Sequence, residues 1–473
     1  MSAPVARLPG VARRLSGVLE AVGGSWLPGS APLPEVVTGV SIDTRTLLPG
    51  ELFVAIHGER LDGHDYLAAA RDRGAGAALV HRAVEAPGGL ALVRVADTTR
   101  ALADLARAAR RAARLPVLVI TGSVGKTTTK EIAASLLGTL GPVLKTEGNL
   151  NNRYGLPLTL LRLLPEQRAA VLELGMNHAG ELRELARLAQ PDVAVITSVA
   201  AVHLEFFDSL EAIAEAKAEV LEGLGPGGVA VLNADDEHLL RVGRRHAGRV
   251  IWFGRERSCE VSAGNWRGSL AGMRFDLRVG GRALDVALPL VGAHNLTNFL
   301  AAAAAAHAAG LAPEAIAAAA SQVGPAPHRG EVRLLGAGVT LLDDCYNSNP
   351  AAVAAAVSAL GLAAARRRVA VLGDMLELGP SGPELHRQAG RALAGRVELV
   401  VGVGALARDI LAGAREAGLP EGALLAFPDA ASAAAALPGL VQPGDAVLVK
   451  GSRGVRLEAV VEALVASLGA GAR

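Results

Sequence analysis

Short runs of apolar residues recur along the chain, and segments with helical periodicity separate them. The middle of the sequence has five such runs, at residues 116–120, 170–174, 193–196, 229–232 and 250–253. Each run is almost continuously apolar, whereas a strand with one solvent-facing side would alternate apolar and polar residues. Continuous runs joined by helices are typical of parallel strands that are covered on both faces. The pattern therefore predicts an α/β domain around a buried parallel sheet.

A smaller block precedes this middle region. It has strand-like runs at 51–56 and 77–80, which are bounded by the turn signals Pro-Gly at 49–50 and Asp-Gly at 62–63. The following helix has three candidate N-caps, Asp97, Thr98 and Thr99, and places Leu102, Leu105 and Ala109 on one face. We therefore expect the first domain to end just before this helix.

The pattern changes twice after residue 260. Residues 275–279 alternate apolar and polar side chains before Gly280-Gly281, which predicts an antiparallel hairpin. From about residue 326, apolar runs return at 369–372, 399–401 and 446–449, separated by alanine-rich segments. Alanine is the strongest helix former, so these segments are predicted to be helices and the block a further α/β domain.

Composition narrows the class of protein. A chain of 473 residues exceeds what one core usually serves, and half of its residues are apolar while a fifth are charged. The net charge of +1 gives no bulk attraction for nucleic acid or a membrane surface. The longest apolar stretch, 299–306, is far shorter than the ~20 residues that span a bilayer. We therefore expect no nucleic acid partner and no membrane insertion.

The cysteines and the N-terminus indicate a compartment. Cys259 and Cys345 lie far apart in the sequence and form no metal-type pair. Reduced thiols are the expectation, and a disulfide between them stays the alternative. The first residues lack the apolar core of a signal peptide. These features favour a cytoplasmic protein.

A glycine-bearing loop follows the strand predicted at 116–120. It reads Thr-Gly-Ser-Val-Gly-Lys-Thr-Thr at 121–128, and we expect a helix from Lys130. Backbone N–H groups of such a loop face phosphate oxygens, while Lys126 can meet the β- and γ-phosphates and Thr127 can ligate Mg²⁺. The general pattern has glycine at position 120, where this chain has Ile120, so a chance glycine-rich turn is the alternative. The predicted ATP-binding residues of the loop are Gly122, Ser123, Val124, Gly125, Lys126, Thr127 and Thr128.

Further motifs follow this loop in a fixed order, and together they resemble the Mur ligase family. The family loop T-G-[ST]-x-G-K-T matches 121–127, including the missing first glycine. The other matching segments lie at 146–152, 172–176, 197–203, 292–298, 343–350, 372–379 and 450–453. The resemblance implies a uridine-nucleotide-binding domain (1–96), a central phosphate-loop ATPase-like parallel sheet domain (97–325) and a Rossmann-like C-terminal domain (326–473).

The resemblance also implies two Mg²⁺ sites. Thr127 and Glu173 would hold one ion, because Glu173 ends a predicted strand where ligand-contacting groups of open sheets gather. His203 and Lys217 would serve the second, with Lys217 carbamylated so that a cation becomes a carboxylate-like anion. From the residues alone, His203 reads as a structural histidine and Lys217 as a solvated helix lysine among glutamates. Together with Lys126 these residues are the predicted catalytic set.

Two segments of the resemblance concern ATP. The motif G-x-H-N-x-x-N at 292–298 is associated in the family with the ATP base, which assigns Asn295 and Asn298 to it; a helix N-cap is the alternative for Asn295. Arg329 and Asp344 would reach the ATP phosphates or ribose from the third domain. Family members usually have glycine directly before the arginine that corresponds to Arg329, but this chain has His328 there.

Substrate contacts are implied by the remaining matches. The segment at 146–152 lines the family's substrate pocket, and the segments at 41–45 and 58–64 resemble its uridine-nucleotide domain. Asn347 would help to seat the incoming amine. The predicted substrate-binding residues are Ser41, Thr44, Arg45, Thr146, Asn149, Asn151, Asn152 and Asn347.

The third-domain motifs select a branch of the family. The segments at 343–350 and 372–379 resemble the branch that joins D-alanyl-D-alanine to UDP-N-acetylmuramoyl-tripeptide, and the D-N-P-R segment of a related branch is missing. The resemblance implies ATP-dependent amide ligation through an acyl phosphate, with ATP and Mg²⁺ required and a monomeric enzyme. A ligase with another amino donor, or a regulatory nucleotide-binding protein without ligase chemistry, stays the alternative.

Overall fold

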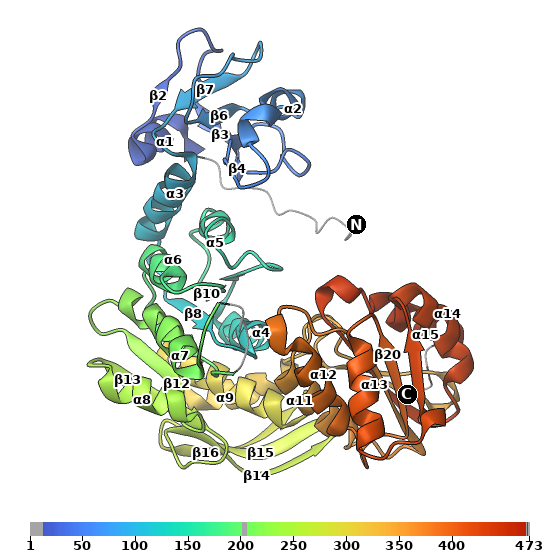
Figure 1. Ribbon diagram of the computed structural model, residues 1–473. Coiled ribbons are helices and arrows are strands. Elements are labelled where there is room, and N and C mark those ends of the chain that lie inside the picture. The colour runs from blue at the N-terminus through green and yellow to red at the C-terminus, as the bar shows by residue number, and fades with distance from the viewer. Residues whose placement is uncertain (1–12, 201–205, 470, 472–473) are drawn as a thin grey trace.

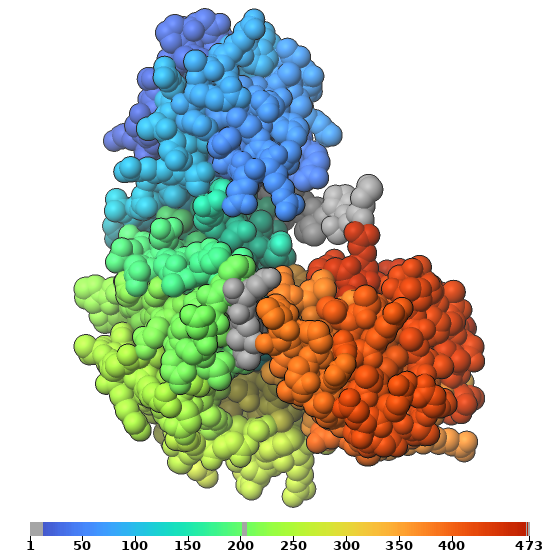
Figure 2. Space-filling model, viewed as in Figure 1, coloured from blue at the N-terminus to red at the C-terminus, as the bar shows by residue number. Residues whose placement is uncertain are grey.

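The computed structural model describes residues 13–200, 206–469 and 471. The chain folds into three α/β units in sequence order (Figure 1). Figure 2 shows the N-terminal unit in blue above the central unit and the C-terminal unit in orange and red beside it. The expected α/β class is therefore confirmed. No helix in the described part of the chain is both long and apolar enough to cross a membrane.

The N-terminal unit is built on a five-stranded sheet in the order β2-β7-β6-β5-β4, in which β4 to β7 are parallel. A separate antiparallel pair joins β1 to β3. The bounds are β1 Arg13–Arg14, β2 Ser25–Trp26, β3 Val36–Val37, β4 Val40–Ser41, β5 Leu52–Val54, β6 Ala77–Val80 and β7 Ala91–Arg94, with helices α1 Leu15–Val22 and α2 Leu67–Asp72.

Helix α3 (Thr98–Ala112) leads from this unit into the central one (Figure 1). Of the three candidate N-caps the structure has Asp97, whose side chain accepts a hydrogen bond from the Arg100 N–H, while Thr98 and Thr99 lie within the helix. Leu102 and Leu105 are buried as predicted, while Ala109 of the same predicted face is half-buried. The helix packs against α1 on one side and α5 and α6 on the other, so it ties the two units together.

The central unit holds a nine-stranded sheet in the order β16-β15-β14-β13-β12-β11-β8-β10-β9. Its strands are β8 Val117–Thr121, β9 Val143–Lys145, β10 Ala169–Glu173, β11 Val193–Ile196, β12 Val229–Asn233, β13 Arg249–Gly254, β14 Val261–Ser269, β15 Gly272–Val279 and β16 Arg282–Leu288. Strands β8 to β14 pair in parallel, and β14 to β16 form an antiparallel extension that contains the predicted hairpin.

Two apolar layers cover the central sheet. Val117 and Val119 of β8 belong to one layer, and Leu118 and Ile120 belong to the other, so successive side chains of one strand enter opposite cores. This arrangement explains the continuous apolar runs in the sequence. The helices are α4 Lys126–Leu137, α5 Gly155–Leu160, α6 Glu181–Ala189, α7 Leu210–Ala218, α8 Glu237–Arg245, α9 Ala293–Ala308 and α10 Pro313–Ala319.

Helix α9 is the apolar stretch that the sequence analysis singled out. Its residues 299–306 are all fully buried, and six of them are alanines. The helix packs against α4 and against strands of the central sheet. Small side chains permit this close double contact, so α9 holds its polar N-terminal turn beside the loop that precedes α4.

The C-terminal unit has a six-stranded sheet in the order β17-β18-β22-β19-β20-β21, parallel except for β17. Its elements are β17 Glu331–Leu334, β18 Thr340–Asp343, α11 Pro350–Leu360, β19 Arg367–Gly373, α12 Gly382–Arg391, β20 Leu399–Val403, α13 Ala407–Glu416, β21 Leu424–Phe427, α14 Ala430–Leu440, β22 Asp445–Lys450 and α15 Glu458–Leu468. The domain boundaries proposed after residues 96 and 325 stay predictions; they fall just before α3 and before β17.

Candidate active site

The phosphate loop lies between β8 and α4, at the point where the strand order reverses around β8. Helix α4 begins at Lys126 and not at Lys130, so the predicted start was four residues late. The reason is Gly125, whose φ of 87° ends the loop directly at the helix. Lys126, Thr127 and Thr128 therefore form the first turn, where N–H groups are unpaired within the helix and attract anions.

The two loop glycines allow close approach of neighbouring elements. A Cβ at Gly122 would lie 1.9 Å from Thr197 Oγ1, which follows β11. A Cβ at Gly125 would lie 2.2 Å from Asn298 Oδ1, on α9. Thr197 Oγ1 also donates a hydrogen bond to the Val124 carbonyl, at 2.6 Å. The loop is thus held from both sides, and a larger residue at either glycine would displace it.

Asn298 of α9 lies beside the loop and is hydrogen-bonded to the second predicted asparagine, Asn295. Asn298 Nδ2 donates to Asn295 Oδ1 at 3.2 Å, and Asn295 Nδ2 donates to the Val291 carbonyl at 2.9 Å. Helix α9 begins at Ala293 with Gly292 as its N-cap, so the alternative that Asn295 is the N-cap is wrong. Contact with the ATP base stays a prediction.

Lys126 and Glu173 bring opposite charges to the loop. Lys126 Nζ donates to the Gly122 carbonyl at 2.7 Å. Burial lowers the pKa of Lys126, the Glu173 charge opposes that shift, and the Arg329 charge adds to it. Glu173 ends β10, the strand next to β8, and its Oε1 accepts a hydrogen bond from Asn151 Nδ2 at 2.9 Å. Its Oε2 is buried and has no hydrogen-bond partner among the described residues, which suits a cation ligand.

Lys217 lies on α7 and is only 2% exposed. The alternative that it is a solvated helix lysine is therefore wrong. Burial, followed by the charge of Lys126, holds the pKa of Lys217 well below its usual value. A neutral amine is the form that adds to carbon dioxide to give a carbamate, so the site favours the implied modification, which itself stays a prediction. His203 lies outside the described residues.

The C-terminal unit contributes a cation to the phosphate loop. Arg329 Nη2 lies 3.5 Å from Thr127 Oγ1, and its guanidinium carbon stands 4.2 Å from the centre of the Tyr346 ring. The Arg329 Nε is buried without a partner among the described residues. Arg329 thus lies beside the phosphate loop, and its predicted contact with the ATP phosphates or ribose stays a prediction. Tyr346 was not singled out from the sequence.

Asp344 of the C-terminal unit is bound to a lysine of the same unit. Its Oδ2 pairs with Lys450 Nζ at 2.7 Å, and Lys450 also donates to the Asn347 carbonyl at 3.0 Å. Burial lowers the pKa of His294 on α9, the Asp344 charge opposes that shift, and the Lys450 charge adds to it. The motif at 450–453 could be recognised in the sequence, but no role for Lys450 could be predicted, because its partner Asp344 lies 106 residues away. His294 was likewise given no role.

The predicted substrate segment adjoins Glu173. Thr146 Oγ1 accepts a hydrogen bond from the Glu173 N–H at 2.9 Å, and the Thr146 carbonyl accepts one from the buried Lys130 Nζ at 2.7 Å. Asn152 Oδ1 accepts from the Gly155 N–H at 2.9 Å at the start of α5, and Asn149 is exposed. Lys130 therefore joins α4 to the substrate segment, a role that was not predicted from the sequence.

The N-terminal unit places its predicted residues after β4. Ser41 Oγ donates to the Asp43 carbonyl at 3.1 Å, and Arg45 pairs with the Asp43 side chain at 2.7 Å. Thr44 is half-buried and Arg45 is 86% exposed. These residues lie at the carboxyl edge of the parallel strands, where ligands of open α/β sheets bind.

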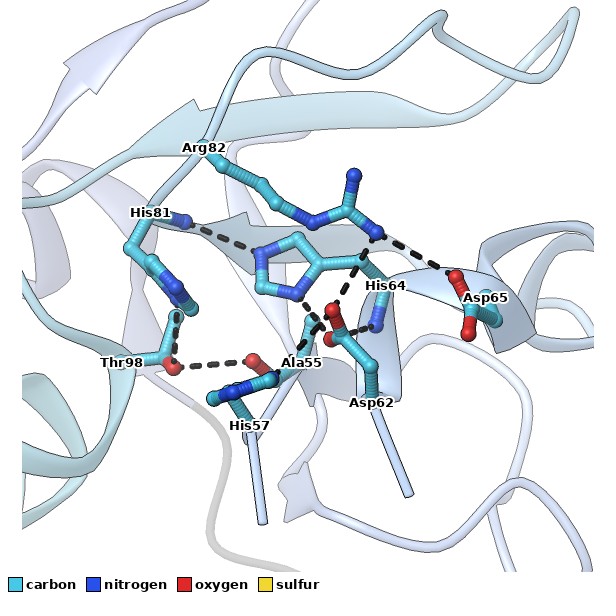
Figure 3. A network of polar contacts seen from close by, with 8 residues as sticks. All are labelled: Ala55, His57, Asp62, His64, Asp65, His81, Arg82 and Thr98. Atoms are coloured by element: carbon cyan, nitrogen blue, oxygen red, sulfur yellow. Dashed lines mark hydrogen bonds and ion pairs between the residues drawn. The ribbon is translucent and has the colours of Figure 1, made fainter. Parts of the chain in front are cut away.

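A polar network lies after β5 and β6, at the same edge (Figure 3). His64 is buried, donates from Nδ1 to Asp62 Oδ1 at 2.6 Å, and accepts from the His81 N–H at 3.2 Å. Arg82 lies 3.2 Å from Asp62 Oδ2. Although burial acts to raise it, the hydrogen bonds from His64 and the neighbouring charges hold the pKa of Asp62 far below its usual value. The network fixes the 58–64 segment that the sequence assigned to nucleotide binding.

Comparison with known proteins agrees with this geometry. Family models match the Mur ligase family catalytic domain at 36–110, the Mur ligase middle domain at 120–306 and the Mur ligase glutamate ligase domain at 328–453. The UDP-N-acetylmuramoyl-tripeptide--D-alanyl-D-alanine ligase of Escherichia coli is 39% identical over 90% of this chain and 93% of its own length.

Solved structures show the same likeness. A crystal structure of MurF from Acinetobacter baumannii has a TM-score of 0.89 and 33% identity, covering 97% of this chain and 100% of that one. MurF ligase from Thermotoga maritima, in complex with ADP, has a TM-score of 0.80 and 30% identity, covering 90% of this chain and 97% of that one. The chain belongs to the Mur ligase family.

Proposed function

We propose that this chain joins D-alanyl-D-alanine to UDP-N-acetylmuramoyl-tripeptide at the expense of ATP. The observation that carries the proposal is the meeting of two domains at the phosphate loop, where Arg329 reaches Thr127 Oγ1. The Escherichia coli relative, named for this reaction, supports the choice of substrates. A site assembled from two domains suits a ligase, because it can hold a nucleotide and two further substrates together.

The first step would activate a poor electrophile. An oxygen of the tripeptide's terminal carboxylate attacks the γ-phosphorus, the bond to the β-phosphate oxygen breaks, and ADP leaves. Negative charge spreads over the transferred phosphoryl group, so fixed positive charge stabilises it. Lys126 and Arg329 supply that charge, and the N–H groups of the first turn of α4 orient the phosphate chain.

The second step would form the amide. The dipeptide amine attacks the acyl carbon of the acyl phosphate, the carbon–oxygen bond breaks, and phosphate leaves as the nitrogen loses a proton. Burial of the site by two domains limits loss of the acyl phosphate to water. We assign Asn347 and its neighbours on the C-terminal unit to seating the dipeptide. The ATP requirement supports a cytoplasmic setting.

The residues present fit a divalent cation. Thr127 and Glu173, whose Oε2 has no hydrogen-bond partner within the described part of the chain, would hold one Mg²⁺. A carbamylated Lys217 with His203 would hold a second. When bound, the ions neutralise phosphate charge and act as Lewis acids. The depressed pKa of Lys217 keeps its amine available for carbamate formation.

The test is a reaction with each substrate left out in turn. Purified protein is incubated with ATP, Mg²⁺, the UDP-linked tripeptide and D-alanyl-D-alanine, and phosphate release and product mass are followed. Release that needs both substrates, with a product heavier by the dipeptide less water, would support the proposal. Release that needs the tripeptide but a different amine would point to another amino donor. Release indifferent to both would point to a nucleotide-binding protein without ligase chemistry.

A further inference from the structure

The residue before Arg329 has a left-handed backbone conformation, which costs energy for a residue with a side chain. His328 has φ of 59°, in the left-handed region that glycine adopts without cost and a histidine does not. The family pattern has glycine at this position. The site is also the link between the central and C-terminal units, which follows Val323 of the central core and precedes β17. A strained residue at a domain junction requires a compensating contact.

That contact joins His328 to Asp343 at the end of β18, and we call it the clasp. His328 Nδ1 lies 2.8 Å from Asp343 Oδ2, and the His328 carbonyl accepts a hydrogen bond from the Tyr346 N–H at 3.2 Å. The imidazole and the backbone of one residue thus hold two points of the segment 343–346. Since glycine has no side chain, a family member with glycine here would lack the first of these attachments.

Asp343 is a firm anchor for the clasp. It is fully buried, and its Oδ2 is shared with Arg333 Nη2 at 3.2 Å. Its Oδ1 accepts a hydrogen bond from the Cys345 thiol at 3.2 Å. Burial and the Asp343 charge raise the pKa of Cys345, so the thiol keeps the proton that it donates. With both oxygens engaged, this carboxylate is a fixed point, and a metal ion would have to displace these partners.

The clasp sets the position of the next residue. Arg329 stacks on Tyr346, whose backbone His328 holds, and points its Nη2 toward Thr127 Oγ1. The stacking partner and the residue before the arginine are therefore fixed to one another. We infer that His328 is a positioning residue: its bond to Asp343 holds the Arg329–Tyr346 pair against the phosphate loop. The inference rests on the proposed ATP chemistry at that loop.

The chain offers matched variants to test this. His328→Gly removes the imidazole and relieves the backbone. His328→Asn is the rescue variant, because an Asn side chain tolerates positive φ and carries a donor nitrogen at the position of Nδ1. Ala337→Gly is the control for relieved backbone, since Ala337 has φ of 56° on an exposed turn away from the loop.

The readouts are kcat for phosphate release and the Kd for ADP with Mg²⁺. We expect His328→Gly to lower kcat about tenfold, His328→Asn to stay within about twofold of the parent, and Ala337→Gly to change nothing. In an Arg329→Ala background, His328→Gly should add less than about twofold, because its effect passes through the arginine.

Two results would overturn the inference. One is an unchanged kcat in His328→Gly, and the other is the same loss with and without Arg329, which would indicate a general structural role. Should His328→Gly fail to fold, His328→Ala against His328→Asn carries the same comparison, because both keep a Cβ. Failure of the proposed function would look different: the parent protein would then bind no ADP and show no substrate-dependent phosphate release.

Discussion

Replacing Lys130 with methionine should weaken both the fold and the substrate segment. The Lys130 side chain is 2% exposed, and its Nζ donates to the Thr146 carbonyl and pairs with Glu131 Oε1, each at 2.7 Å. Methionine keeps most of the buried methylene surface, so the packing loss stays under about 1.5 kcal/mol. The change in activity and the change in stability can therefore both be traced to the lost ammonium.

The loss of the Lys130 ammonium costs different amounts of free energy at its two partners, Thr146 and Glu131. The Thr146 carbonyl is left without its charged donor, which costs about 1–3 kcal/mol. Glu131 keeps a second partner in Lys145 and is 24% exposed, so this pair adds about 1 kcal/mol or less. We expect Lys130→Met to lower the free energy of unfolding of the central unit by about 2–3 kcal/mol. The matched control is Lys145→Met, which removes the 45% exposed partner of the same carboxylate and should cost under about 1 kcal/mol.

Urea unfolding followed by tryptophan fluorescence can measure this difference. The three tryptophans are Trp26 in the N-terminal unit and Trp252 and Trp266 in the central one, so a Trp26→Phe background reports the central unit alone. Because Thr146 opens the substrate segment, Lys130→Met should also raise the KM for the UDP-linked tripeptide about tenfold, with a smaller effect on the KM for ATP. Equal midpoints and equal KM values for Lys130→Met and Lys145→Met would refute the reasoning.

Three further perturbations test the site and the N-terminal network. Lys217→Ala should lose more than about 100-fold in kcat, with partial recovery in acetate or propionate; full activity without acid would remove Lys217 from the mechanism. Glu173→Gln keeps the shape of the side chain but loses its charge, so the Mg²⁺ concentration for half-maximal activity should rise about tenfold or more; an unchanged Mg²⁺ titration would contradict the metal assignment. The Asp62 pKa is depressed on folding, so Asp62 contributes stability above its unfolded pKa near 4 and loses it as pH falls through the folded pKa. Asp62→Asn should therefore lower the melting temperature of the N-terminal unit at pH 7 and approach the parent below about pH 4; a pH-independent difference would exclude that cause.

The sequence pattern predicted the buried strands well and the irregular ones poorly. Residues 193–196 form β11 as predicted, because a continuous apolar run has few alternatives when both faces are covered. β14 was missed, since Gly264 and Asn265 lie where its register with β15 shifts and successive residues in its second half are exposed. β9 was missed because three residues at a sheet edge carry too little pattern.

In the site, too, contiguous motifs could be predicted from the sequence, whereas contacts between distant segments could not. The phosphate loop is contiguous in sequence, so residues 121–128 could be identified, apart from the start of α4, which depends on the conformation of Gly125. The burial of Lys217 depends on what packs over α7, and its glutamate neighbours in sequence suggest the opposite. The clasp of His328 on Asp343 joins residues fifteen positions apart through a sheet register that no local pattern specifies.

The alanine-filled helix α9 has a consequence for how this protein can change over generations. Its residues 299–306 have no exposed surface, and it carries Asn295 and Asn298 beside the phosphate loop. An alanine side chain has no rotamers to change. A larger residue at one of these positions therefore fits only if the helix or the residues packed against it move. Each enlargement would overpack the interior by about 1–3 kcal/mol and push the nucleotide contacts out of place. A larger residue at one of these alanines is therefore expected to require a compensating smaller residue on α4 or on a facing strand of the central sheet.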